Sequence, residues 1–172
     1  MRSDSLAERN VISRNNFAGF SQEWEAGGVK VAGVDNVTFR HNKVHDNNGT
    51  GLWSDICSTH VHYIENLLVN NSGPGVSHEI SLNSTIHGNI ACSNGWGKPH
   101  WLWGGQLQVQ NSEGVVVSNN SVVVGAARGT NGMTLVQQNR TQCADQIGLP
   151  FHAARRNAFL DNRVYPAAWG VS

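Results

Sequence analysis

The sequence predicts an all-β fold, a right-handed parallel β-helix of about six coils, from three observations. Like residues recur at a spacing of 24 positions. Within each repeat, apolar residues alternate with polar ones, which is the period of a β-strand. Asparagine returns at fixed places in the repeat, as a turn residue would in a stack of coils. Together these observations indicate short coils stacked along one axis.

The repeat is clearest between two segments that begin at Val37 and Val61. Eight positions match at one offset, which is difficult to attribute to chance. The first set is Val37, Phe39, Asn42, Asn47, Gly51, Leu52, Asp55 and Ile56, and the second is Val61, Tyr63, Asn66, Asn71, Gly75, Val76, Glu79 and Ile80. A third coil follows at an offset of 23, with Ile86, Asn89 and Asn94.

Later coils are separated by longer intervals. The asparagine column moves from Asn89 to Asn120 and then to Asn162, in steps of 31 and 42 residues. These steps predict inserted loops near residues 95–104 and 138–156. Insertions in a repeat stack map to one face, which is often the binding face.

The recurrent asparagines predict ladders that hold successive coils together. Asparagine accepts left-handed turn conformations, and its amide both donates and accepts hydrogen bonds. The predicted ladder is Asn42, Asn66, Asn89, Asn120 and Asn162. Glycines mark a second corner, where the backbone must approach closely or take a positive φ, at Gly51, Gly75, Gly105 and Gly132.

Composition excludes several classes of protein. Only 14% of the 172 residues are charged, and twelve basic side chains balance twelve acidic ones. No basic field that would attract nucleic acid is present. No apolar run is long enough for a membrane span, and the first twenty residues lack the apolar centre of a secretory signal. Cys57, Cys92 and Cys143 have no metal-ligand spacing and are expected to be buried free thiols.

The chain is expected to form one domain, 1–172. Solenoids need polar caps at both ends, and neither terminus has the sequence of one. We therefore expect a segment of a longer protein, or a homo-oligomer that pairs through an uncapped coil end.

Five short segments resemble a known family. They are Trp24-Glu25-Ala26-Gly27-Gly28, Gly51-Leu52-Trp53-Ser54-Asp55, Gly73-Pro74-Gly75, Glu79-Ile80-Ser81 and Asn94-Gly95. In these segments the chain resembles the bacterial right-handed parallel β-helix repeat proteins of the pectate-lyase-like superfamily. The resemblance implies polysaccharide lyases, glycoside hydrolases, epimerases or non-catalytic members, many of them secreted. No catalytic motif of a characterised lyase or epimerase is matched, so the localisation and the activity stay open.

Strand alternation predicts a polar stripe on one sheet. If Leu52, Ser54 and Ile56 point into the coil, the residues between them point outward. The same alternation in neighbouring coils extends the stripe, while His78 is expected to point inward. The stripe is Lys30, Trp53, Asp55, Ser77, Glu79, Gln108 and Gln110.

A tryptophan-rich insertion is predicted beside this stripe. Residues 95–103 contain Trp96, Trp101 and Trp103, half of the six tryptophans in the chain. Indole faces bury the C–H surface of a sugar, and amide or acid side chains bind its hydroxyl groups. The combination predicts a site for a polysaccharide or oligosaccharide, although the same tryptophans could instead cover an open sheet.

Asp55 and Glu79 occupy equivalent positions on adjacent coils, roughly 4.8 Å apart by strand spacing. Two carboxyl groups this close raise one pKa and suit acid/base catalysis, with Lys30 as a base or charge neutraliser. Alternatively they bind Ca²⁺, or they form a solvated surface paired with Lys30. Arg140 could bind the carboxylate of an acidic sugar.

Two classes of function follow. One is a polysaccharide lyase or glycoside hydrolase that uses Asp55, Glu79 and Lys30. The other is a non-catalytic β-helix that binds carbohydrate or has a structural role. Two carboxyl groups converging in a cleft would favour the enzyme, whereas a flat, open stripe would favour binding.

Overall fold

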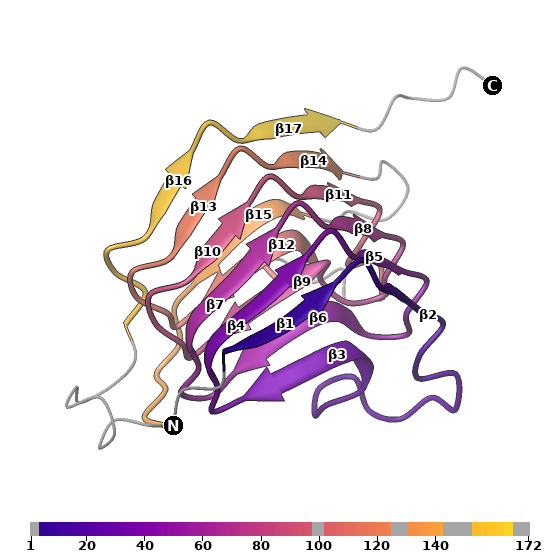
Figure 1. The fold of residues 1–172 in the computed structure, drawn as a ribbon, viewed down its shortest axis with the longest axis horizontal. Helices are drawn as coiled ribbons and strands as arrows, with labels where there is room; N and C mark the ends of the chain where they lie inside the picture. Colours follow the sequence, from indigo (N-terminus) through magenta and orange to yellow (C-terminus); the bar gives the residue numbers. More distant parts are fainter. Residues whose placement is uncertain (1–3, 98–101, 125–130, 143–152, 167–172) are drawn as a thin grey trace.

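The chain winds into a parallel β-helix with three sheets (Figure 1). The computed structural model describes residues 4–97, 102–124, 131–142 and 153–166. The first sheet contains β1 (Ser5–Glu8), β4 (Asp35–Arg40), β7 (Thr59–Ile64), β10 (Thr85–His87), β13 (Val116–Ser118) and β16 (Ala158–Leu160). The second contains β2 (Val11–Ser13), β5 (Lys43–His45), β8 (Leu67–Val69), β11 (Ile90–Cys92), β14 (Ser121–Val124) and β17 (Arg163–Pro166). The third contains β3 (Gly27–Ala32), β6 (Thr50–Asp55), β9 (Val76–Glu79), β12 (Gly105–Gln110) and β15 (Asn131–Val136).

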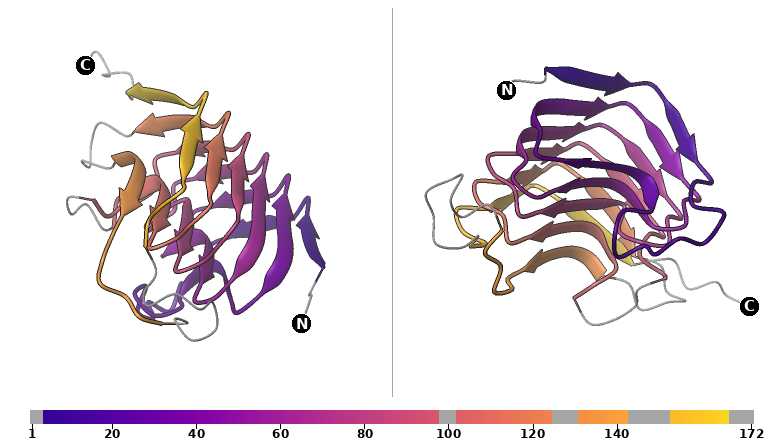
Figure 2. Two further views of the ribbon diagram at one scale, coloured as in Figure 1. Left: turned by 90° about the vertical axis from the view of Figure 1, so that its left-hand side faces the viewer. Right: turned by 90° about the horizontal axis from the view of Figure 1, so that it is seen from below.

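Successive coils stack with like residues in register, and Figure 2 shows the resulting rows of parallel strands. Val37 pairs with Val61 and Leu52 pairs with Val76, so the predicted offset of 24 residues is confirmed. Six strands in each of the first two sheets confirm the predicted six coils. The two predicted insertions lie between β11 and β12 and between β15 and β16.

A continuous apolar core fills the coils. Phe39 and Tyr63 stack with ring centroids 5.7 Å apart, one coil above the next. His78 is fully buried, as predicted, and its Nδ1 lies 2.6 Å from Ser54 Oγ. Ile56 was predicted to point into the coil, but it lies in a turn with φ 29° and is 39% exposed.

The predicted asparagine ladder is confirmed. Asn66 donates from its backbone N–H and from Nδ2 to Asn89 Oδ1, at 2.9 and 3.0 Å. Its Nδ2 also donates to the carbonyl oxygen of Phe39. Asn42, Asn89 and Asn120 repeat this geometry in their own coils. Each rung therefore satisfies turn groups of two coils at once.

A second ladder follows the next corner and explains an error in the predicted glycine column. Asn47 donates to Asn71, and Asn71 donates to Asn94. Gly105 was expected to stack on Gly75 in the fourth coil. The register instead places Gln106 there, and Gly105 lies one position earlier. Gln106 Oε1 accepts hydrogen bonds from Asn94 N and Nδ2. Gly51 is required by close approach, since an added Cβ would lie 2.6 Å from the Gly75 oxygen.

The expectation of free thiols is wrong for one cysteine. Cys57 is disulfide-bonded, whereas Cys92 is free and half-buried. Cys143 lies outside the described residues.

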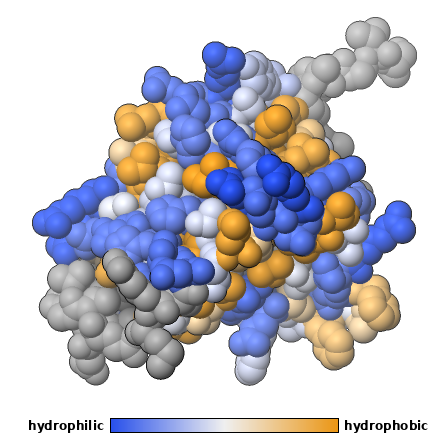
Figure 3. Space-filling model, in the orientation of Figure 1, coloured by the Kyte–Doolittle hydropathy of each residue, from blue (hydrophilic) through white to orange (hydrophobic). Residues whose placement is uncertain are grey.

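On the face seen in Figure 3, hydrophobic residues are scattered among hydrophilic ones. The most exposed aromatic side chains, Phe17, Phe20 and Trp24, belong to the segment between β2 and β3. No helix in the described ranges has the length and apolar character needed to span a membrane.

Candidate functional site

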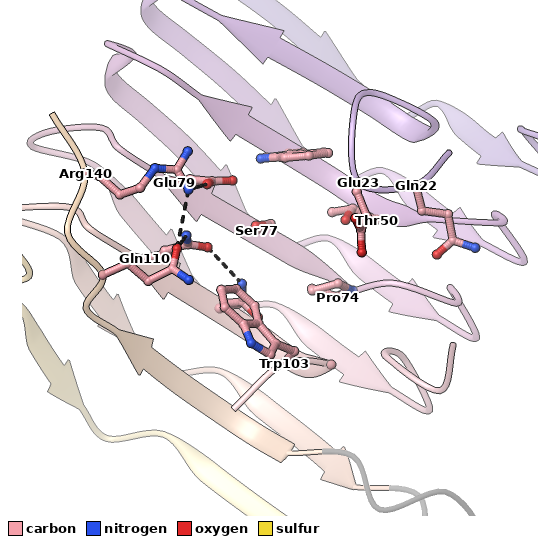
Figure 4. Close-up of a pocket in the computed structure, with 13 residues that line it drawn as sticks. Gln22, Glu23, Thr50, Pro74, Ser77, Glu79, Trp103, Gln110 and Arg140 are labelled. Atoms are coloured by element: carbon pink, nitrogen blue, oxygen red, sulfur yellow. Dashed lines mark hydrogen bonds and ion pairs between the residues drawn. The ribbon is translucent and has the colours of Figure 1, made fainter. Parts of the chain in front are cut away.

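A pocket of about 370 Å³ lies on the outward face of the third sheet (Figure 4). Its floor comes from strands β6, β9 and β12, and its walls come from the segments that flank them. Ser77 lies near the middle, Glu79 and Arg140 lie at one end, and Gln22 and Glu23 lie at the other. The lining residues are Gln22, Glu23, Thr50, Trp53, Pro74, Ser77, Glu79, Trp103, Gly104, Gln108, Gln110, Gln138 and Arg140.

Five of the seven residues of the predicted stripe form this floor. Trp53 pairs with Ser77, and Ser77 pairs with Gln108, which makes one column. Glu79 pairs with Gln110 in the next column. All five of these residues line the pocket, but they are buried rather than solvated. The stripe is therefore neither flat nor open, because loop segments cover the sheet and leave a pocket.

Asp55 and Lys30 form an ion pair beside the pocket. Lys30 Nζ lies 2.9 Å from Asp55 Oδ2, and it donates to the carbonyl oxygen of Trp24 at 2.7 Å. The same ammonium lies 3.8 Å from the centroid of the Trp53 ring. Asp55 also accepts a hydrogen bond from the Ile56 N–H. Neither Asp55 nor Lys30 lines the pocket, so the paired arrangement considered from the sequence is the one that the structure shows.

Glu79 is a buried carboxylate that lines the pocket. Burial raises its pKa, and the nearby Asp55 carboxylate raises it further. Arg140 and Lys30 oppose this shift, and Arg140 Nη1 lies 3.2 Å from Glu79 Oε1. A raised pKa favours the protonated form of Glu79, which is the form that can donate a proton.

Glutamine amides form the wall next to Glu79. Gln108 Nε2 donates to Gln110 Oε1 at 3.5 Å, and Gln110 Nε2 donates to Gln138 Oε1 at 2.8 Å. Gln22 Nε2 donates to Asn48 Oδ1 at the opposite end. Within the described residues, Gln108 Oε1 and Gln22 Oε1 are buried and have no hydrogen-bond partner, whereas the Trp53 indole donates toward the Glu79 carboxylate. Residues that line the pocket thus offer two unpartnered acceptors to a ligand.

Sequence reasoning missed Gln22, Glu23, Thr50, Pro74 and Gln138. Gln22 and Glu23 belong to the segment between β2 and β3, which interrupts the repeat. The spacing of the asparagines in the sequence indicates that segment. Asn10 bonds Asn42 across 32 residues, whereas Asn42 bonds Asn66 across 24, so the first coil contains an extra eight residues.

The three tryptophans of the insertion have different positions. Trp103 projects into the pocket, as Figure 4 shows. Trp96 is half-buried and does not line it. Trp101 lies outside the described residues. Of the two tryptophans that the structure describes here, Trp103 is the one placed for contact with a ligand in the pocket.

Calcium at Asp55 and Glu79 would have to compete with two cations of the protein. Lys30 and Arg140 already lie within ion-pair distance of these carboxylates. In the described part of the chain, no group of three or more His, Cys, Asp or Glu side chains could hold a metal ion.

The turn that follows the two carboxylates is strained. Ile56 follows Asp55 with φ 29°, and Ile80 follows Glu79 with φ 46°. Positive φ is unusual for a β-branched residue and costs about 1–2 kcal/mol. The same conformation recurs at other coil corners, including His41, Glu65 and Asn119, so it is a feature of the repeat.

Comparison with known proteins identifies the repeat. A family model described as "Right handed beta helix region" matches residues 1–122 and residues 27–169. No curated protein and no solved structure matches the chain.

Proposed function

The chain belongs to the right-handed β-helix family, and we propose that it binds a saccharide in the pocket on its third sheet. The volume of about 370 Å³ lies within the usual range for ligand pockets, roughly 300–1,000 Å³. The lining combines four glutamine amides with the indoles of Trp53 and Trp103, and one ion pair lies at one end. This composition fits a ligand that is rich in hydroxyl groups.

The unpartnered buried polar atoms carry the proposal. Gln108 Oε1 and Gln22 Oε1 both require donors. A sugar carries several hydroxyl groups, each of which can donate a hydrogen bond to one of these oxygens. A buried polar group without a partner costs about 1–3 kcal/mol. A bound sugar would recover part of that free energy.

Trp103 supplies the apolar part of the site. Its indole lines the pocket on the side of Gln110. One region of the Trp53 ring is already covered by Lys30, which leaves Trp103 as the better surface for the C–H face of a sugar. Aromatic anchors of this kind tend to dominate recognition.

The raised pKa of Glu79 favours a second candidate function, cleavage of the bound saccharide with Glu79 as proton donor. A retaining hydrolase needs a second carboxyl group about 5–5.5 Å away. Asp55 is the predicted second group, but it is bound by Lys30 and does not line the pocket. Binding is therefore the function that the geometry supports better.

A glycan array followed by calorimetry tests the proposal. The best-bound saccharide is titrated into the parent protein and into Gln108→Leu, which lacks the amide acceptor. We expect the variant to bind at least about tenfold more weakly, a loss of about 1.4 kcal/mol. Thr134→Val is the matched control, because Thr134 pairs with Gln108, is buried and does not line the pocket.

The control should bind as the parent does. Equal affinity of the parent and Gln108→Leu, or no saccharide bound by the parent, would refute the proposal. Product analysis on the same saccharides separates the two candidate functions. Cleavage that Glu79→Gln abolishes would establish the enzyme.

A further inference from the structure

Five ionisable side chains lie in or beside the pocket, and their charges nearly cancel. Lys30 pairs with Asp55, and Arg140 pairs with Glu79. Glu23 lines the opposite end, is exposed, and has no ion pair within the described residues. When all five are ionised, the site carries one net negative charge.

Both cations are engaged by the protein. Lys30 contacts the Asp55 carboxylate, the carbonyl oxygen of Trp24 and the face of Trp53. Arg140 contacts Glu79 at 3.2 Å, and it donates to Gln138 and Gln142 at 3.4 and 3.2 Å. An incoming carboxylate would therefore meet no excess of positive charge.

We propose that the pocket selects neutral saccharides and discriminates against acidic ones. The inference rests on the proposed saccharide binding and names its substrate class. A carboxylate loses more hydration free energy than a hydroxyl group on entering a buried site, and only an unpaired cation would compensate for that loss. Near Arg140, the ligand carboxylate would also lie close to the Glu79 carboxylate, which repels it.

The polar atoms without partners favour the same ligand class. Gln108 Oε1 and Gln22 Oε1 are acceptors, so they attract hydroxyl donors and repel a carboxylate. Arg140 thus pairs with Glu79 and does not bind the carboxylate of an acidic sugar.

Glu79 is accordingly the residue that sets the charge preference. Replacing it by glutamine keeps the shape of the side chain and removes the negative charge beside Arg140. The site would then contain a cation without a carboxylate partner at 3.2 Å. Glu79→Gln should therefore gain affinity for acidic saccharides.

Calorimetry with matched ligands tests the inference. The probes are cellotriose, galactotriose and mannotriose, each beside the counterpart in which the C6 hydroxymethyl groups are oxidised to carboxylates. The parent should bind the best neutral trisaccharide at least about tenfold more tightly than its acidic counterpart. Glu79→Gln should reduce that ratio at least about fivefold, through a gain in affinity for the acidic member.

Two further variants locate the effect. The double variant Glu79→Gln with Arg140→Gln should lose the gain in affinity for the acidic trisaccharide, because the freed guanidinium is absent. Glu23→Gln removes an exposed negative charge without freeing a cation, so it should change the ratio less than Glu79→Gln does. A parent that prefers the acidic member, or a ratio that Glu79→Gln leaves unchanged, would overturn the inference. Binding of neither member by the parent would refute saccharide binding itself.

Discussion

Glu79 is a carboxylate that the fold holds at a cost in stability. It is buried, it lies near Asp55, and its pKa is raised even though Arg140 and Lys30 stabilise its charge. Since the folded state binds the proton more tightly than the unfolded chain does, the contribution of Glu79 to stability is full below about pH 4.5 and is lost as the pH rises through the raised value. A group retained under such a cost is a candidate for function.

Replacing Glu79 with glutamine should stabilise the protein at neutral pH. The amide has the same shape and no charge to bury, and this gain should exceed the loss of the partly exposed ion pair with Arg140. Urea unfolding at pH 7 should show a higher midpoint for Glu79→Gln than for the parent, and the difference should shrink at pH 4. A lower midpoint at pH 7 would mean that the ion pair outweighs the burial of the carboxylate.

His78 should give the stability curve the opposite slope. Burial lowers its pKa to about 3, against about 6.5 in an unfolded chain. The stability that it contributes is therefore full above about pH 6.5 and is lost as the pH falls toward 3. The free energy of unfolding of His78→Gln should fall less than that of the parent between pH 7 and pH 4.5. His60→Gln, at an exposed position, is the control for removing a histidine.

Single residues show where sequence reasoning succeeds. The outward direction of Trp53, Asp55 and Glu79 follows from strand alternation, and the structure agrees. Ile56 was expected inward, but the chain leaves the strand after Asp55 and turns with positive φ. Alternation predicts directions only while the backbone stays extended.

Among the structural elements, the asparagine ladders distinguish this fold most clearly. Each buried rung both donates and accepts, so removing one leaves polar groups in two coils without partners. Asn66 accepts from Asn42 and donates to Asn89 and Phe39. The ladder thus connects coils through side chains as well as through the sheets.

Asn66→Ala should lower the free energy of unfolding by about 3–5 kcal/mol, because several buried groups lose partners at about 1–3 kcal/mol each. Asn10→Ala is the control at the exposed end of the same ladder, where Asn10 donates to Asn42 and is solvated. It should cost about 1 kcal/mol or less. Equal midpoint shifts in guanidinium chloride for the two variants would show that burial of the ladder does not determine its strength.

For the molecule as a whole, the repeat period could be predicted from the sequence, whereas the loop segments that cover the third sheet could not. Recurrence fixes which residues stack, and hence the six coils and the columns of the site floor. The segments that enclose the floor, such as residues 14–26, have no counterpart in other coils. Their position depends on single contacts, including Lys30 with Trp24 and Gln22 with Asn48. These contacts make the outward stripe the floor of a pocket.

The most direct test of saccharide binding in this pocket is to fill it. Ser77 is a small residue in the floor between Trp53 and Gln108, and leucine at this position would occupy the space above it. Thr38→Leu, on the half-buried outward face of β4 away from the pocket, is the matched control. Calorimetric titration should show parent-like affinity in Thr38→Leu and no measurable binding in Ser77→Leu, with both variants folded. Unchanged saccharide affinity in folded Ser77→Leu would contradict the account.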